Sequence, residues 1–388
     1  MVLIHAGKET VLELADQAHE HSLSLFIPTH RRGKQVLEGQ DQIAFKNHLQ
    51  NVRQKLKDKV LRQQDIDALM EPLEALLEDP GFWRHQQEGL AVFRNPDYFA
   101  VFHSPMPLED SYRLDARFHV HPLLPFVQPF PEYYLLQIGK KDVSLYQANP
   151  FSIQPVAPHI SMPSGLEAVT KYYDFEEELQ GRTRGPGGMA ALYTSDDSDN
   201  KEKDHLLADY FRKVDEVIKD EIGTKNVPLV LASVAYYQPI YRQINSYPHL
   251  LEEGITGNFD HVQPGDMHQM ANDLLEDRFV QARSRRMSQY QQSVGSGLTS
   301  SDLPQILEAA VMGRIEVLFL RTDAERWGRF NPETLNTTVL ETREPDSESL
   351  IDTAALLTLR QGGDVYVLEE MEGLNEQPDA LAAALFRF

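Results

Sequence analysis

Two adjacent glycines in a basic stretch form the pattern that most directly suggests chemistry. Gly187 and Gly188 precede Met189, and Arg182 and Arg184 lie just before them. Paired glycines allow backbone angles that are closed to other residues, and they permit close approach to a partner. The stretch carries no strong base, so a reaction there would depend on positioning a substrate or a water molecule. A flexible loop without chemistry would give the same pattern.

A short acidic segment after the glycines could bind a divalent metal. Asp196, Asp197 and Asp199 lie close together, and His205 follows them. Carboxylates of this kind bind magnesium in nucleases. The stretch Ser195–Asn200 is rich in serine, aspartate and asparagine, which favours a polar loop instead. A metal-dependent RNA nuclease therefore stays open as an alternative function.

Two other groups of histidines and carboxylates lack the spacing of a known metal site. His119 and His121 alternate, so on a strand they would share one face. Neither group contains a pattern such as His-Glu-x-x-His. We therefore expect no metal and no other cofactor. The second group comprises Asp260, His261, Asp266 and His268.

Three clusters of basic residues are candidates for contacts with RNA, because the arginine fork suits phosphate oxygens. The formal net charge of −22 argues against a surface that coats nucleic acid generally, since that needs a basic field. It does not exclude RNA contacts at a few basic patches. A solvated surface is the other explanation for each cluster. The clusters are Arg182 with Arg184, Arg283 with Arg285 and Arg286, and Arg31 with Arg32 and Lys34.

The composition indicates a folded protein of two or three domains. Of its 388 residues, 41% are hydrophobic and 25% are charged. The chain has no cysteine, which excludes disulfides and thiolate chemistry and fits a reducing cytoplasm. We expect no signal peptide at Met1–Thr10 and no membrane partner, because no apolar run approaches the ~20 residues of a membrane helix. Phosphate-loop, dinucleotide and Gly-x-Ser-x-Gly motifs are absent from the sequence.

The segments around the glycines are expected to be two strands and a long helix. Tyr133–Ile138 and Val143–Tyr146 read as strands joined by the tight turn at 139–142. Asp204–Ile222 is the clearest helix in the chain, and Gly223 stops it. Its apolar stripe consists of Leu207, Tyr210, Phe211, Val214, Val217, Ile218 and Ile222.

The first part of the chain is expected to form an α+β domain. Leu23–Thr29 reads as a strand, and a helical stretch over about 41–78 follows, with a break near Gln64. Asn95–Asp97 separates the two strands of a hairpin. A proline-rich passage over 125–131 marks the first domain boundary.

The last part alternates strands with helices, which predicts a mostly parallel sheet covered by helices. The stretch Asn331–Glu348 reads as a polar loop. The predicted fold class is therefore mixed α/β (α+β), with three domains at 1–130, 131–224 and 225–388. The expected strands are Val227–Val234, Ile315–Leu320 and Asp364–Leu368, and the expected helices are Leu303–Met312 and Ser349–Arg360.

Set in order, these segments resemble the bacterial relatives of the archaeal and eukaryotic class I peptide-chain release factors. In that family two strands lead to a basic loop with Gly-Gly-Gln, and a long helix follows. Here the tripeptide at 187–189 reads Gly-Gly-Met, and Asp204–Ile222 takes the place of the helix. Ala309–Leu320 and the tail Ala354–Leu368 are similar to the family's third domain. The first 130 residues resemble only the divergent bacterial branch.

The resemblance implies a ribosome-associated translation factor that acts at or near the A site. Its partners would be the ribosome, ribosomal RNA and tRNA, with a GTPase as a further candidate and no role for DNA. In the family, the glycine loop enters the peptidyl-transferase centre and its glutamine stands beside the attacking water. Met189 has a thioether and no amide, so efficient peptidyl-tRNA hydrolysis is not expected, and the chain is not expected to be an enzyme. A protein-binding adaptor without catalysis is another alternative.

Overall fold

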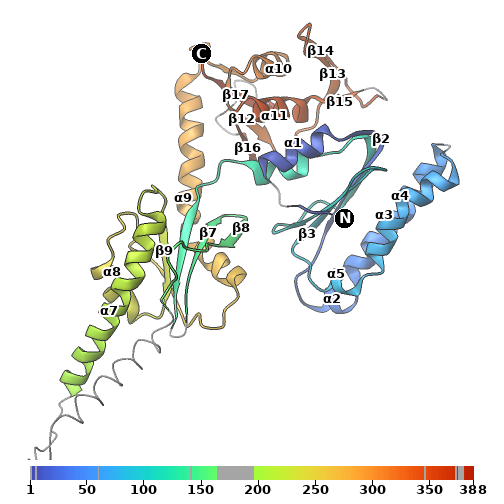
Figure 1. Cartoon of the computed structure of the whole chain (residues 1–388). Helices are drawn as coiled ribbons and strands as arrows, with labels where there is room; N and C mark the ends of the chain where they lie inside the picture. The colour runs from blue at the N-terminus through green and yellow to red at the C-terminus, as the bar shows by residue number, and fades with distance from the viewer. Residues whose placement is uncertain are drawn as a thin grey trace, which may run out of the picture. The chain divides into compact units, whose positions relative to one another are not determined.

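The computed structural model describes residues 2–4, 7–59, 61–139, 142–163, 196–344, 347–371, 374 and 380–388, with the backbone alone over 196–204. The chain divides into two compact units (Figure 1). The first unit combines Met1–Pro129 with Arg286–Phe388, and the second is Phe130–Arg285. The mixed α/β class predicted from the sequence is confirmed, because both units combine sheets with covering helices.

The N-terminal part of the first unit is built on a five-stranded sheet in the order β1-β4-β3-β2-β5. β1 runs parallel to β4, and the other neighbours are antiparallel. The expected strand at Leu23–Thr29 and the hairpin around Asn95–Asp97 are both present. The strands are β1 (Val2–Leu3), β2 (Ala18–Pro28), β3 (Gly89–Arg94), β4 (Phe99–Ser104) and β5 (Ser111–Arg117).

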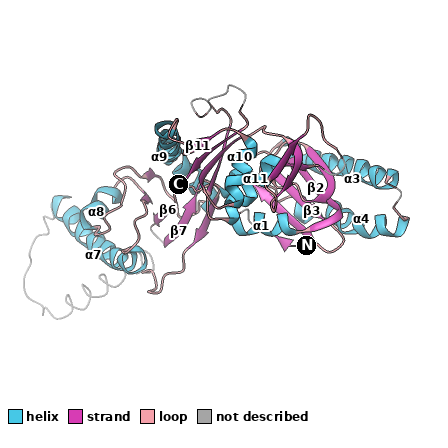
Figure 2. Ribbon diagram, turned by 90° about the horizontal axis from the view of Figure 1, so that it is seen from above, coloured by secondary structure: helices cyan, strands magenta, loops and turns pink. Residues whose placement is uncertain are grey.

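Helices cover one face of this sheet (Figure 2). They are α2 (Lys34–Leu37), α3 (Gln40–Asp58), α4 (Gln63–Leu77) and α5 (Pro80–Trp83). Alternate strand residues such as Leu23, Leu25 and Ile27 point toward them and form one core with Phe45 and Leu73. The break in the long helical stretch lies between Asp58 and Gln63.

A buried arginine completes the backbone hydrogen bonding of α4. Pro72 lies inside that helix and has no N–H, so it cannot donate to the carbonyl of Ala68 four residues earlier. The side chain of Arg94 on β3 supplies the missing donor, with Nη2 3.1 Å from the Ala68 oxygen and Nε 3.2 Å from that of Leu69. The same guanidinium reaches the Tyr98 carbonyl at 3.3 Å. Helix α4 is thereby fastened to the hairpin of β3 and β4.

The opposite face of the sheet is covered by α1 (Lys8–Asp16) and the 3-10 helix η1 (His121–Val127). Aromatic rings meet there edge to face, as in Phe26 with Phe93 and Phe102 with Phe126. Helix α11 (Leu350–Arg360) contacts α1, and β16 (Asp364–Leu368) contacts η1. The two ends of the chain therefore pack against each other within this unit.

The C-terminal part of the first unit has a four-stranded sheet, β11-β17-β12-β16, and a three-stranded sheet, β14-β13-β15. Helices α10 (Leu303–Val311) and α11 pack together beside the first. Side chains cap both helices, since Asp302 accepts from the Gln305 N–H and Ser349 from that of Asp352. The remaining strands are β11 (Thr299–Ser300), β12 (Ile315–Arg321), β13 (Trp327–Asn331), β14 (Asn336–Val339), β15 (Glu348–Ser349) and β17 (Ala382–Phe386).

The second unit is a five-stranded sheet in the order β10-β9-β6-β7-β8 with helices on both faces. Helices α7 (Asp196–Ile222) and α8 (Tyr237–Ile244) cover one face. The N-terminal half of α9 (Pro264–Ser293) covers the other through Met267 and Leu275. The strands are β6 (Tyr133–Ile138), β7 (Val143–Asn149), β8 (Ser152–Pro155), β9 (Leu229–Ser233) and β10 (Ile255–Thr256).

Strand pairing differs from the sequence-based expectation at two places, because the C-terminal sheet is mostly antiparallel and β9 lies outside it. β12 and β16 are parallel neighbours as expected, but β12 also pairs antiparallel with β17. β9 was expected in the same sheet, and it pairs instead with β6 in the second unit. The boundary expected at residue 224 thus falls between α7 and β9, two elements of one compact unit. A continuous apolar strand is buried in either sheet, so its composition does not identify its partner.

Two segments expected to be polar loops contain regular structure. Helix α7 begins at Asp196, so the acidic residues at 196–199 are helical. Asn331–Glu348 contains the β13–β14 turn and the strand β14. Both segments are short of apolar residues, and a pattern based on burial misses an exposed helix turn or an exposed hairpin.

Candidate functional site

The paired glycines lie outside the described residues, as do the arginines beside them. This applies to Gly187, Gly188, Met189, Arg182 and Arg184. The structure describes the elements on both sides of that segment, which are the β6–β7–β8 meander before it and α7 after it (Figure 1). These elements confirm the expected two strands and long helix.

Helix α7 is fixed to the sheet along its apolar stripe. Tyr210, Phe211 and Val214 are fully buried and pack against Leu136 and Leu145 of the sheet. Burying each of these side chains stabilises the packing by roughly 1.5–3 kcal/mol. Helix α7 is therefore held against the sheet over the part that carries these side chains.

Hydrogen bonds also hold the C-terminal part of α7 and the connection that follows it. Asp215 on the helix accepts from the backbone N–H of Ser246 at 2.9 Å. The hydroxyl of Tyr247 lies 2.6 Å from the carbonyl oxygen of Val227 and 3.0 Å from that of Lys225. The connection from α7 to β9 is thus attached to the segment that follows α8.

The residues suggested for metal binding do not form a metal site in the part of the chain that the structure describes. No group of three histidine, aspartate or glutamate side chains there could hold a metal ion. His205 is largely exposed and lies 3.3 Å from Asp209 on the same helix. His268 lies 2.7 Å from the backbone oxygen of Asn149, which is a structural contact. Side chains at 196–204 lie outside the description.

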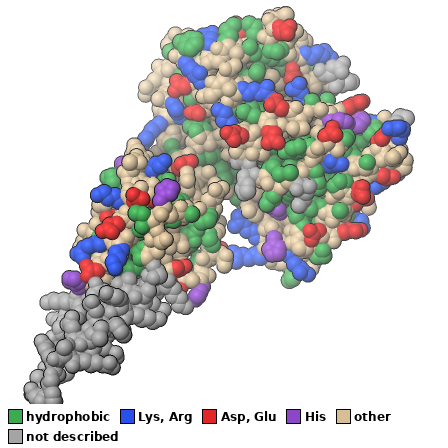
Figure 3. All heavy atoms as spheres, in the orientation of Figure 1, with side chains coloured by type: hydrophobic (Ala, Val, Ile, Leu, Met, Phe, Trp, Pro, Cys, Tyr) green, Lys and Arg blue, Asp and Glu red, His purple; other side chains and the backbone are tan. Residues whose placement is uncertain are grey.

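The basic clusters divide into paired and exposed members. Arg286 bridges two strands, with Glu316 at 3.0 Å and Asp364 at 3.3 Å. Arg31 lies 3.2 Å from Glu88. Lys34 lies 3.3 Å from Glu38. Arg32, Arg283 and Arg285 are exposed and take no part in these ion pairs. On the face shown in Figure 3, acidic and basic side chains are interspersed among the described residues.

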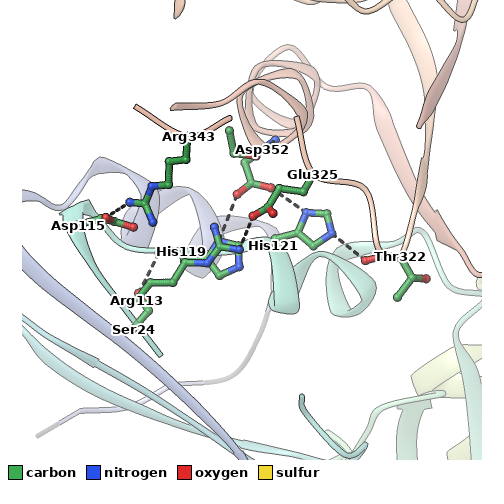
Figure 4. Close-up of polar contacts among 10 residues, drawn as sticks. Ser24, Arg113, Asp115, His119, His121, Thr322, Glu325, Arg343 and Asp352 are labelled. Atoms are coloured by element: carbon green, nitrogen blue, oxygen red, sulfur yellow. Dashed lines mark hydrogen bonds and ion pairs between the residues drawn. The ribbon is translucent and has the colours of Figure 1, made fainter. Parts of the chain in front are cut away.

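A polar cluster that the sequence did not reveal joins the two ends of the first unit (Figure 4). It consists of His119, His121 and Asp352, and is called the His–Asp–His cluster below. His121 Nδ1 lies 2.7 Å from Asp352 Oδ1, and His119 Nδ1 lies 3.4 Å from Asp352 Oδ2. The two imidazole rings are stacked, with centroids 6.1 Å apart and planes 5° from parallel.

The cluster is positioned by the elements on each side of it. The backbone N–H of His119 donates to Ser24 Oγ of β2 at 2.8 Å, and His121 is the first residue of η1. Asp352 lies in the first turn of α11, where the positive end of the helix dipole favours a carboxylate. The histidines were expected on one strand face. They do share one side, but on a loop and a 3-10 helix, because Pro122 and Pro125 cannot donate to a strand ladder.

The two histidines of the cluster have opposite pKa shifts. Burial lowers the pKa of His119, because it outweighs the attraction of Asp352. Burial also acts to lower the pKa of His121, but the hydrogen bond to Asp352 and its charge prevail, so that pKa is raised. Burial disfavours the Asp352 carboxylate, yet the hydrogen bonds from both histidines hold its pKa far below the usual range. Protonation of His121 is therefore favoured over protonation of His119, and Asp352 is favoured in its ionised form.

Further contacts between the N-terminal and C-terminal parts of the first unit lie beside the cluster, where Figure 4 shows Arg113 near Glu325 and Arg343 near Asp115. Trp327 of β13 is contacted by two guanidinium groups, that of Arg113 at 5.4 Å and that of Arg343 at 4.7 Å from its ring centroid. Arg113 also lies 2.6 Å from Glu325, and Arg343 forms an ion pair with Asp115. Cation–π contacts of this kind contribute about 0.5–2 kcal/mol each. They attach β13 to the edge strand β5.

Comparison with known proteins gives a family match over the second unit. Residues 133–277 match the model of bacterial archaeo-eukaryotic release factor family 7. This range lies within Phe130–Arg285 and spans the strands β6 and β7, the glycine segment and α7. The resemblance to release-factor relatives drawn from the sequence is thereby confirmed. No match was found among the curated proteins.

Three solved structures are similar to the chain at low identity. The archaeal translation termination factor aRF1 has 14% identity and a TM-score of 0.25, with 100% of this chain and 99% of that chain covered. Thermoplasma acidophilum Pelota has 11% identity and a TM-score of 0.25, with 77% and 80% covered. Archaeal Pelota, from a model of ribosome-bound Pelota and ABCE1, has 16% identity and a TM-score of 0.33, with 73% of each chain covered. Among the described residues, no helix is long and apolar enough to cross a membrane.

Proposed function

We propose that this release-factor-like chain is a ribosome-associated translation factor that acts at or near the A site. Rescue of stalled complexes, quality control and occupation of idle ribosomes are the roles that fit. The observation that carries the proposal is the family match over 133–277. It covers the elements that would hold and aim the segment containing Gly187 and Gly188.

In this proposal the second unit is the probe of the peptidyl-transferase centre. The buried stripe of α7 and the Tyr247 contacts give the glycine segment a fixed base. Close approach to RNA would use the two glycines, and Arg182 and Arg184 would contact phosphates. Met189 offers no side-chain amide to hold a water, so hydrolysis would be inefficient.

The other proposed partners follow from action at the ribosomal A site. Ribosomal RNA and tRNA would be contacted by the arginines of the other two basic clusters, which are Arg31, Arg32, Arg283, Arg285 and Arg286. A GTPase partner is proposed for delivery to the A site. The proposed location is the cytoplasm, where these partners are found. The division into domains at 1–130, 131–224 and 225–388 remains a prediction.

Ribosome co-sedimentation tests the proposal. The wild-type chain should sediment with ribosomes at low salt, and binding should weaken as salt rises, because phosphate contacts release counterions. The double variant Arg182→Ala, Arg184→Ala should bind less, with a smaller salt slope. Its matched control is Lys57→Ala, Arg62→Ala, which removes two exposed basic residues outside the clusters. Absence of binding at every salt concentration would overturn the proposal, and magnesium-dependent RNA cleavage would favour the nuclease instead.

A further inference from the structure

We propose that His121 is a doubly protonated imidazolium whose charge fastens the N-terminal segment of the first unit to its C-terminal segment, so that this association depends on pH. The inference does not rest on the proposed function. It rests on the position of one ring between two acceptors that belong to the C-terminal segment.

Both ring nitrogens of His121 face hydrogen-bond acceptors. Nδ1 lies 2.7 Å from Asp352 Oδ1, and Nε2 lies 3.1 Å from the backbone oxygen of Thr322. A carboxylate oxygen and a carbonyl oxygen can only accept. A neutral imidazole has a single N–H and could satisfy one of them, whereas an imidazolium donates to both. The geometry therefore selects the charged form.

The neighbouring histidine has a different environment. His119 has one ring nitrogen near the shared carboxylate, at the longer distance of 3.4 Å. Its ring packs edge to face against Phe26, with centroids 6.0 Å apart. A second positive charge stacked on His121 would be repelled and poorly solvated. His119 thus remains neutral while His121 carries the charge.

Charged groups from the surrounding elements leave this assignment intact. Arg113 on β5 disfavours the His121 charge, but it is engaged by Glu325. Asp323, which follows β12, lies near enough for His121 to act on its pKa, and its main partner is Arg321. Asp352 is the carboxylate in direct contact with the ring.

The two other elements packed against η1, which are α1 and β16, also carry acidic residues. On α1, Asp16 pairs with Arg360, and Glu13 acts on Tyr98. On β16, Asp364 pairs with Arg286. None of these pairs competes with the contact between His121 and Asp352.

The sign of the pH dependence follows from the higher proton affinity of the folded state. Well below pH 6.5 the imidazole is protonated in both the folded and the unfolded state. The hydrogen bonds from His121 to Asp352 and to Thr322 then contribute fully to stability. As pH rises through the pKa of His121 in the folded state, the imidazolium loses a proton and one of its two hydrogen bonds is lost. Each unit by which that pKa exceeds 6.5 changes the folding equilibrium constant tenfold across this window. The hydrogen bonds from the histidines hold the pKa of Asp352 below its usual range, so this carboxylate adds no change there.

Nitrogen NMR of the imidazole rings in the full chain tests the proposal directly. The chain has 14 histidines, and the signal lost in His121→Gln assigns the ring. We expect both ring nitrogens of His121 to have imidazolium shifts at pH 6.5 and to titrate above that value. A neutral ring with a single protonated nitrogen at pH 6.5 would overturn the proposal, and this measurement needs only wild-type protein if the variant fails to fold.

Thermal unfolding between pH 6.5 and 9 gives a second readout. The wild type should lose stability over this range, and His121→Gln should lose less, because the titrating group has been removed. His205→Gln, at an exposed histidine, is the matched control and should retain the wild-type slope. An identical slope in wild type and His121→Gln would contradict the proposal.

Discussion

His121 and Asp352 are 231 positions apart in sequence, and the nitrogen of one lies 2.7 Å from the oxygen of the other. The contact joins the start of η1 to the first turn of α11. Both side chains are mostly buried, with 13% of each exposed. A buried pair of this kind specifies how two segments fit, because either charge alone in that place would be unstable.

Replacing the carboxylate should therefore destabilise the first unit. The Asp352→Asn variant removes the negative charge that favours a protonated His121. The asparagine side chain also brings N–H groups that face the imidazole ring of His121. We expect a loss of about 3 kcal/mol in the free energy of unfolding at pH 6.5, measured by urea denaturation. The loss should be smaller at pH 9, where the wild-type imidazolium has been deprotonated. Asp323→Asn is an exposed control, and a loss in Asp352→Asn no greater than that control's would contradict the account.

Arg94 completes the backbone hydrogen bonding of helix α4, so its replacement should destabilise the first unit. In Arg94→Met, the Ala68 carbonyl loses its donor and stays buried, which should cost about 2–3 kcal/mol. Pro72→Ala restores an N–H four residues after Ala68, so Arg94→Met should cost less in that background. Urea denaturation of the two single variants and the double variant forms the test. Additive losses would show that Pro72 and Arg94 are not coupled through this carbonyl.

The arginines of the 283–286 cluster should separate into two kinds. Arg286→Ala breaks contacts with Glu316 and Asp364, so it should lower the thermal midpoint of unfolding. The double variant Arg283→Ala, Arg285→Ala removes exposed side chains, so its thermal midpoint should stay near wild type while its ribosome binding weakens. Loss of stability in the double variant without loss of ribosome binding would assign these two residues a structural role.

Peptide release on ribosomes tests the account of Met189. We expect slow release by the wild-type chain and faster release by Met189→Gln, by up to about 10²-fold if the amide positions the attacking water. Met189→Leu is the control, since it has a similar size and no amide. Equal rates for wild type and Met189→Gln would refute the explanation based on the missing amide, while leaving ribosome binding to be judged separately.

The sequence was most informative where hydrophobic periodicity is strong. The α7 stripe and the strands β6 and β7 were predicted within a few residues, because burial imposes their spacing. The partner of β9 was not predictable, since a strand with apolar residues on both faces fits several sheets. The acidic start of α7 was missed for the opposite reason, because an exposed helix turn has no apolar stripe.

The His–Asp–His cluster could not be found from the chain order alone. The spacing of His119 and His121 indicates a pair, but their partner comes from a distant helix. One local signal was present, since Ser349 and Asp352 have the Ser-x-x-Asp spacing of a helix N-terminus. Asp352 also lies among the buried residues Leu350, Ile351 and Ala355. An acidic residue on the apolar face of a helix indicates a buried partner without identifying it.

Residue 189 is proposed to reach the peptidyl-transferase centre, and site-specific photo-crosslinking can measure whether it does so. A photoreactive amino acid replaces Met189, and a second variant carries the same group at the exposed position of Lys57 as a control for random contact. Both are irradiated on ribosomes after co-sedimentation. We expect crosslinks from position 189 to large-subunit RNA at the peptidyl-transferase centre, and none to that RNA from position 57. Ribosome-bound protein that gives no such crosslink from position 189 would contradict it.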